Sequence, residues 1–320
     1  MAEPTTVQPA SGAAVKPRQP CPCGSGKRYK NCHGAAGGAA DVIVVRPFEG
    51  LAAECELVAL REFVPSATAR LPLREGGEVT VATVLPLAAA ALRRTDDRAF
   101  VGLQVQTHSG DISRDIARAV EWVQNAEAGS SLSVVGPETA QPGVMPTRLQ
   151  DLLDPEADLE VELHEDFSWW LPEGVDPSSE VALSLERANS AIMPTQRLTG
   201  VRSAYWVDAG EKAHLRWVRP EPEEQLLAAL ARLSVRGELA LDEDSRYAGS
   251  FRAHGLLVPV WDLDREKHPR EWEEPAAALG RRLEEALSSL DDEPLDSAET
   301  SSRLPPDPPS PPRSALGWSP

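Results

Sequence analysis

A short cysteine-rich segment near the amino terminus places the strongest constraint on how this chain folds. Residues 21–34 read CPCGSGKRYKNCHG, so a Cys-x-Cys pair is followed, after a glycine-rich stretch, by an adjacent Cys-His pair. Zinc prefers four tetrahedral nitrogen and sulfur ligands, and a closed set of this kind is typical of a structural site. The segment has almost no apolar side chains, so we expect bound metal to supply the free energy of its folding. The predicted zinc ligands are Cys21, Cys23, Cys32 and His33.

Two alternatives to zinc are a disulfide and a set of reduced thiols. A cytosolic compartment argues against a disulfide, and His33, beside Cys32, would have no role in one. The chain has one further cysteine, Cys55, which lies in a segment with helical spacing. We interpret Cys55 as a lone helix cysteine and not as a fifth ligand.

The same residues resemble a known family. The string from Cys21 to His33 is similar to the SEC-C motif, the zinc-binding segment at the carboxyl end of the SecA preprotein-translocase ATPase. The resemblance implies zinc ligation by the four residues named above, and in SecA it implies docking of the SecB chaperone and contact with anionic lipid. Here the motif lies at the opposite end of the chain and no Walker A string follows it, so ATPase activity does not carry over.

Charge is divided unevenly along the chain. The formal net charge is −18 and the isoelectric point is about 4.8, which disfavours nucleic acid as the main partner of the body because phosphates would be repelled. Residues 1–34, in contrast, carry several lysines and arginines and a single glutamate. We therefore expect a basic head on an acidic body.

The amino terminus lacks the pattern of a secretory signal, since no positively charged start is followed by an apolar core. The longest uncharged apolar run, residues 79–92, is too short to span a bilayer and contains Pro86. These features predict a cytoplasmic protein without a transmembrane segment.

Composition predicts where the ordered parts begin and end. Small and polar residues at the amino terminus, a Gly/Ala-rich stretch after the cysteine segment, and a Pro/Ser/Asp-rich carboxyl end all indicate disorder or flexibility. The predicted layout is disorder over 1–19, a SEC-C zinc knuckle over 20–34, a flexible linker over 35–40, an α+β body over 41–290 and a disordered tail over 291–320. A division of the body into two halves, 41–147 and 148–290, is a further hypothesis.

Hydrophobic periodicity assigns the body to the α+β class. Asp111 precedes an apolar stripe typical of a capped helix, and the Ala-rich run 87–94 predicts another short helix. After residue 200 the pattern gives two consecutive ββα units, which predict a four-stranded, mostly antiparallel sheet with helices on one face. A looser version of this order over 78–123 raises the hypothesis of a duplicated architecture.

A second resemblance covers most of the body. The chain is similar to an actinobacterial family whose members pair an amino-terminal SEC-C motif with a body of unknown function. The resemblance rests on the strings 46–50, 109–115, 149–155, 203–206, 214–218 and 249–256. It implies the domain layout but brings no known activity and no catalytic residues.

Three functional hypotheses follow. The leading one is a non-enzymatic adaptor, whose basic zinc head recruits a protein or anionic partner while the body binds a second protein or ligand; anionic lipid and the ribosome are further candidates. The alternative is an enzyme with its site on the body, using His108, Asp111 or Arg114, or His254 in a tight turn. In the third, the basic head docks on its own acidic body.

Strand tryptophans offer one more candidate surface. Trp206, Trp217 and Trp261 fall on predicted strands close to arginines, a combination that can stack nucleobases. We interpret them as sheet packing, because the negative charge of the body opposes nucleic acid.

Overall fold

The computed structural model describes residues 16–20, 27–31, 43–106, 109–136 and 146–302. The four predicted zinc ligands and His108 lie outside these residues. Within them the body is α+β, as the periodicity predicted, with one mixed and one antiparallel sheet.

The first sheet is built from the amino-terminal half of the body and from one later strand. Its order is β5-β3-β4-β2-β1-β6, and β2 and β4 run parallel while the other neighbours are antiparallel. The strands are β1 (Ala67–Arg70), β2 (Val79–Ala82), β3 (Ala91–Arg93), β4 (Ala99–Gly102), β5 (Ser131–Leu132) and β6 (Val161–Leu163). Strands β1 and β2 form an antiparallel hairpin.

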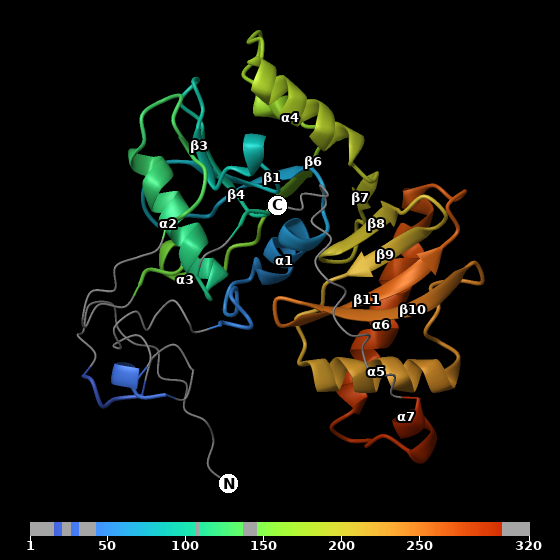
Figure 1. Ribbon diagram of the computed structural model, residues 1–320. Coiled ribbons are helices and arrows are strands. Elements are labelled where there is room, and N and C mark those ends of the chain that lie inside the picture. Colours follow the sequence, from blue (N-terminus) through green and yellow to red (C-terminus); the bar gives the residue numbers. More distant parts are fainter. Residues whose placement is uncertain (1–15, 21–26, 32–42, 107–108, 137–145, 303–320) are drawn as a thin grey trace.

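Helices cover this sheet. The amphipathic helix α2 (Ile112–Asn125) buries Ile116, Val120 and Val123 against it, and the short helix α3 (Leu149–Leu152) lies beside the start of α2 (Figure 1). The helix α4 (Ser179–Ser190) lies at the opposite end of this half (Figure 1). Short 3-10 turns occur at η1 (Tyr29–Asn31), η2 (Pro86–Ala88), η3 (Ser168–Trp170) and η4 (Pro269–Trp272).

The second sheet is antiparallel and has the order β10-β11-β9-β8-β7. Its strands are β7 (Thr195–Arg197), β8 (Ala204–Asp208), β9 (Ala213–Trp217), β10 (Ser245–Ala253) and β11 (Leu256–Leu263). The helices α5 (Glu223–Arg236) and α6 (Glu273–Ser289) pack on one face of it. The two predicted ββα units are therefore confirmed, with β7 added as an edge strand.

The strand tryptophans pack inside this half. Trp206, Trp217 and Trp261 are at most 7% exposed and share a core cluster with residues of α5 and α6. Their burial confirms the packing interpretation and leaves no open aromatic face for stacking bases at these positions.

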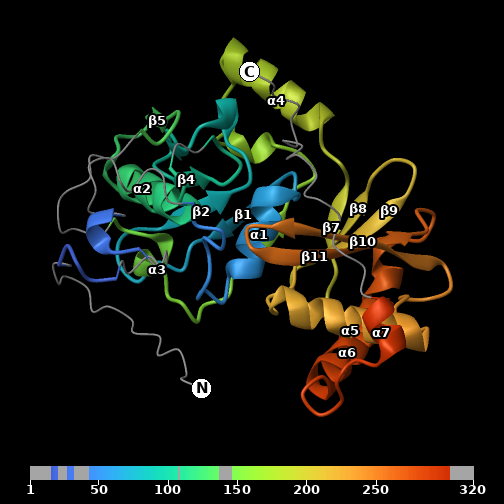
Figure 2. The same ribbon diagram turned by 60° about the horizontal axis from the view of Figure 1, so that its bottom comes forward.

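Helix α1 (Glu54–Glu62) lies between the two sheets in both views (Figures 1 and 2). Leu57 and Leu60 of α1 are fully buried in a cluster that also contains Tyr205 and Val258 of the second sheet. One continuous core therefore joins the two halves, because α1 buries residues against both.

Two sequence expectations for the body differ from the structure. The run 87–94 forms η2 and strand β3 instead of a helix, because Leu87 and Ala88 take positive φ values of 58° and 53° and Ala91 pairs with Val101 of β4. The duplicated architecture is also wrong, since the first sheet contains a parallel pair and the second is antiparallel throughout.

The segment 291–302, which composition placed in the tail, carries helix α7 (Ser297–Ser301). Arg232 of α5, 1% exposed, donates through Nε to Glu299 of α7 at 3.0 Å. The same guanidinium donates to Ser289 Oγ at 2.6 Å and to the carbonyl oxygen of Glu293. A single buried arginine thus fastens the end of the described chain to α5.

Candidate functional site

The described residues on either side of the cysteine motif form one small antiparallel pair. Pro20 bridges Arg28, and the backbone N–H of Tyr29 donates to the carbonyl oxygen of Gln19 at 2.8 Å. The N–H of Lys30 donates to the carbonyl oxygen of Pro17 at 2.9 Å. Pro20 precedes the first Cys-x-Cys pair in sequence and η1 precedes the Cys-His pair, so these hydrogen bonds join the two arms that carry the motif.

The donor set of the motif suits zinc. Three thiols and one imidazole are the side chains that closed tetrahedral zinc sites use. Among the described residues, no group of three or more His, Cys, Asp or Glu could hold a metal ion. The candidate metal centre of the chain is the motif.

The arms of the motif present positive charge to solvent. Every basic side chain described in them is exposed: Lys16, Arg18, Lys27, Arg28 and Lys30. Tyr29, in contrast, is only 3% exposed. The surface of this small unit is therefore cationic, as the uneven charge division predicted.

In the body, four of the family strings meet around the loop that leads into α1 (46–50, 109–115, 149–155 and 249–256). Arg148 donates through Nη2 to the carbonyl oxygen of Pro47 at 3.0 Å, and Gln150 Nε2 donates to the same oxygen at 2.7 Å. Gly255, at φ +82°, lies so close that a Cβ there would be 2.8 Å from Cβ of Arg46. Segments far apart in sequence are thus brought to one place, where the loop joins α2, α3 and the β10–β11 turn.

Asp111 and Arg114, two residues named in the enzyme hypothesis, lie at the start of α2 beside this loop. Asp111 accepts from the N–H of Ser113 at 3.1 Å as the cap of α2, and it pairs with Arg148 at 2.8 Å. Arg114 is 4% exposed on the buried side of the helix. Capping and ion pairing account for Asp111, and the hypothesis that it acts with His108 stays untested because His108 lies outside the described residues.

His254 lies in the β10–β11 turn at a positive φ of 48°. Its Nε2 is 3.3 Å from Oε2 of Glu62 at the end of α1, and its ring contacts Phe48 edge-on at 6.2 Å between centroids. The imidazole lowers the pKa of the Glu62 carboxyl. The pair therefore links the second sheet to α1, and the His254 side chain is only 16% exposed in its turn.

A cleft of about 710 Å³ opens where α1, the second sheet and α6 meet. Its volume is within the range of small-molecule sites. Its apolar lining comprises Leu51, Val201, Trp217, Val218, Pro220 and Ala277. The absence of a side chain at Gly280 lets α6 approach Trp217 closely, since a Cβ at this position would be 3.3 Å from the Trp217 ring.

Two charged residues in the wall of the cleft are already paired. Glu54 accepts two hydrogen bonds of 2.7 Å from Arg46. Arg219, stacked 4.8 Å above the Trp217 ring, donates to both carboxylate oxygens of Glu221. These pairs neutralise the inner wall.

Cys55 also lines the cleft. Burial, followed by the negative charge of Glu54, raises the pKa of its thiol to about 12. The thiolate is the nucleophilic form of cysteine, so Cys55 is protonated and inert at neutral pH. It contributes packing and a weak S–H donor, not covalent chemistry.

Two residues that line the cleft, Ser203 and Arg281, carry hydrogen-bond donors that have no partner among the described residues. Ser203 is 3% exposed, has φ +54°, and its hydroxyl makes no hydrogen bond within the described residues. Arg281 is exposed on α6, and its guanidinium likewise has no partner in that part of the chain. The sequence analysis did not single out Arg281, because no motif or hydrophobic pattern distinguishes it from other arginines on a helix. Ser203 lies within the family string 203–206.

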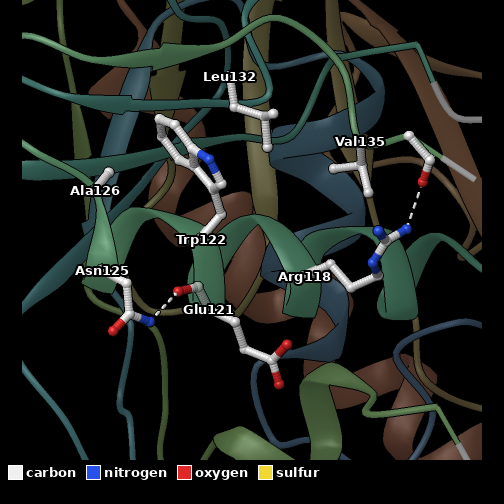
Figure 3. A pocket seen from close by; sticks show the side chains of 8 residues that line it. Arg118, Glu121, Trp122, Asn125, Ala126, Leu132 and Val135 are labelled. Carbon is white, nitrogen blue, oxygen red and sulfur yellow. Dashed lines mark hydrogen bonds between the residues drawn. The ribbon is translucent and has the colours of Figure 1, made fainter. Parts of the chain in front are cut away.

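Two other hollows are less suited to a specific ligand. A groove of about 390 Å³ runs between α2 and β5, where Trp122, Leu132 and Val135 surround a small apolar surface and Arg118 donates to a backbone carbonyl (Figure 3). A larger hollow, about 740 Å³, lies on the first sheet beside Arg70 and Glu162. The first is smaller than the cleft, and the second is lined mainly by polar and charged side chains.

Comparison with known proteins agrees with both resemblances. A family model for the SEC-C motif matches residues 18–35, and a model described as a family of unknown function, DUF5926, matches residues 47–305. No solved structure matches the chain. Over the described residues, no helix is long and apolar enough to cross a membrane.

Proposed function

We propose that this chain, which belongs to the family of unknown function DUF5926, is a zinc-binding interaction protein whose basic amino-terminal motif recruits an acidic protein partner. Zinc would be held by Cys21, Cys23, Cys32 and His33, and bound there it would cross-link the two arms of the motif. No reaction is assigned to it, because a site closed by four protein ligands has no open position for substrate.

The observation that carries this proposal is the antiparallel pairing of the arms, with Pro20 opposite Arg28. Arms that were unrelated in space could not offer their flanking cysteines to one ion. The pairing agrees with a single site, and the match of the SEC-C model to the same residues supports zinc as the ion.

The chemistry of the partner is inferred from charge. The arms expose lysines and arginines to solvent, whereas the whole chain carries a net charge of −18. An acidic protein surface would be drawn to the motif and repelled by the rest of the molecule, which orients the encounter. We also propose a cytoplasmic location, where thiols stay reduced and available to zinc.

Metal content tests the first half of the proposal. We expect one zinc per chain by elemental mass spectrometry in the purified protein and in Cys55→Ser, and none in the double variant Cys21→Ser/Cys23→Ser. Cys55→Ser is the matched control because it removes a cysteine that lies in the body. A zinc-free wild-type protein, or zinc retained by the double variant, would defeat the assignment.

Partner capture tests the second half. The double variant Lys27→Glu/Arg28→Glu should keep zinc but lose partners that bind wild type at low salt, because only the charge has changed. Identical partner lists for wild type, the charge variant and the cysteine variant would rule out recruitment by the motif. Recovery of lipid vesicles or ribosomes, with no acidic protein, would reassign the partner.

A further inference from the structure

We propose that the cleft between α1, the second sheet and α6 binds a small free monocarboxylic acid with an apolar body. This goes beyond the proposed function, since it concerns the body and needs no metal.

The floor of the cleft accounts for the apolar part of such a ligand. Trp217, which is 2% exposed, closes the bottom of the cleft and is held in place on both sides. Its indole N–H donates to the carbonyl oxygen of Arg202 at 2.8 Å, and its ring is covered by Arg219. A rigid apolar floor in a cleft of about 710 Å³ favours an alkyl or aryl group, because burying apolar surface is the main source of affinity in such sites.

Ser203 provides the first polar contact. Ser203 is 3% exposed and lines the cleft. Its hydroxyl has no hydrogen-bond partner among the described residues and is not one of their fully enclosed polar atoms, so it is accessible from the cleft. Ser203 also holds a left-handed backbone conformation, which costs a residue other than glycine about 1–3 kcal/mol and is found most often at binding and catalytic sites. Both observations point to a ligand atom that accepts from the serine hydroxyl.

The charge balance selects a single negative charge. Glu54 and Arg219 are each satisfied by a bidentate partner, and Arg202 is shared with Asp158 at the surface. What remains at the mouth is the guanidinium of Arg281 and, one turn further along α6, the carboxylate of Glu284. Arg281 favours an anion, whereas Glu284 opposes a second negative charge.

These features together describe one ligand class. A carboxylate at the mouth can accept from Arg281 and from Ser203, while its apolar body lies against Val201 and Ala277. A phosphate or a dicarboxylate would bring its extra charge near Glu284. A neutral molecule would leave Arg281 without a partner.

The test uses three probes of equal chain length: hexanoate, adipate and hexanamide. Binding is followed by the indole ¹H–¹⁵N signal of Trp217 in the full chain. A second readout is the thermal transition of the full chain, because a ligand that binds only the folded protein raises it. We expect hexanoate to shift the Trp217 signal saturably and to raise the thermal transition, and both controls to bind more weakly.

Variants locate the site. Arg281→Gln should weaken hexanoate binding by about tenfold, the effect of losing a charge-assisted hydrogen bond. Arg236→Gln is the matched control, since it removes an exposed arginine from α5 instead. Ala277→Leu should abolish binding by filling the floor, with its thermal transition checked for folding.

Several results would overturn the proposal. Among them are no Trp217 shift with any probe up to its solubility limit, equal binding of hexanoate and hexanamide, and binding retained in Ala277→Leu. Tighter binding of acetyl-alanyl-leucine than of hexanoate would reassign the cleft to a peptide carboxyl terminus. Loss of hexanoate binding in Cys21→Ser/Cys23→Ser would contradict its independence from the metal motif.

Discussion

The hydroxyl of Tyr205 on β8 donates a hydrogen bond to the buried carboxylate of Glu56 on α1. The same carboxylate accepts from Arg197 of β7 at 2.7 Å. Glu56 is 6% exposed and Tyr205 is fully buried, so a polar contact lies inside the core that joins the two halves. Burial, and then the negative charge of Glu56, raises the pKa of Tyr205 well above its usual value, which keeps the phenol protonated as a donor.

Tyr205→Phe should therefore destabilise the body. The variant removes one donor from a buried carboxylate and leaves the charge with Arg197 alone, at a cost of about 1–3 kcal/mol. The measurement is urea unfolding at pH 7. Tyr247→Phe is the matched control, because that hydroxyl contacts Ser250 on the edge strand β10 and lies less deeply. Equal stability of Tyr205→Phe and wild type would show that the contact contributes nothing net.

Glu62→Gln should make the free energy of unfolding depend less steeply on pH below about pH 4.5. His254 lowers the pKa of Glu62 in the folded protein below the ordinary value of 4.5. The unfolded chain thus binds the proton more readily, so this carboxyl stabilises the fold above about pH 4.5, and its contribution is lost as pH falls through the folded pKa.

Urea unfolding at pH 6, 5, 4 and 3.5 checks this. Wild type should exceed Glu62→Gln at pH 6 and 5, and the margin should shrink below pH 4.5. Glu285→Gln, which alters an exposed carboxylate on α6, controls for the loss of one acid. A margin independent of pH would assign the effect of the variant to packing instead of to ionisation.

Arg232→Met should release α7 from α5. The change leaves Glu299 buried without its guanidinium partner, and a buried charge in that state is strongly unfavourable. Because α7 lies near the end of the described chain, the segment can move into water and avoid most of that cost. We expect cleavage by the broad-specificity protease proteinase K between residues 291 and 302 to accelerate, with a loss of about 1–3 kcal/mol in unfolding free energy.

Glu299→Gln provides the reciprocal test, since it removes the charge from the other side of the same pair. It should expose the same segment. If cleavage there is as slow in both variants as in wild type, the ion pair is not what holds α7.

The parts of the fold that could be predicted are those encoded locally. Asp111 and the apolar stripe after it define α2, and alternation with turn residues defines the β8–β9 and β10–β11 hairpins. The run 87–94 was misread because Ala and Leu favour a helix locally, while pairing of Ala91 with Val101 decides the outcome. Tertiary contacts override propensity here.

The cleft could not be predicted from the sequence for a related reason. Its wall combines residues near 51–55, 200–203, 217–220 and 277–284, and no local pattern states that these segments meet. From the sequence alone, Arg281 is predicted to be an ordinary arginine on the solvent-exposed face of a helix. The metal motif is the opposite case, since its ligands lie within one short segment and the residue types alone indicate the chemistry.

Ser203→Gly separates stability from binding at the proposed ligand site. Glycine adopts the left-handed backbone conformation without the cost that serine bears at φ +54°, although it also gains freedom in the unfolded chain. The two effects oppose each other, so we expect the free energy of unfolding to stay level or rise by up to about 1 kcal/mol. Hexanoate binding should weaken severalfold, because the hydroxyl is gone.

Urea unfolding and the Trp217 indole titration measure the two quantities on the same sample. Gly200→Ala, at φ +83° in the same wall, is the reverse control: it adds strain without removing a donor and should lower stability. A Ser203→Gly variant that is less stable and binds hexanoate as tightly as wild type would mean that the serine conformation serves the fold. A variant that is as stable as wild type and binds less would mean that strain at this position is retained for the ligand.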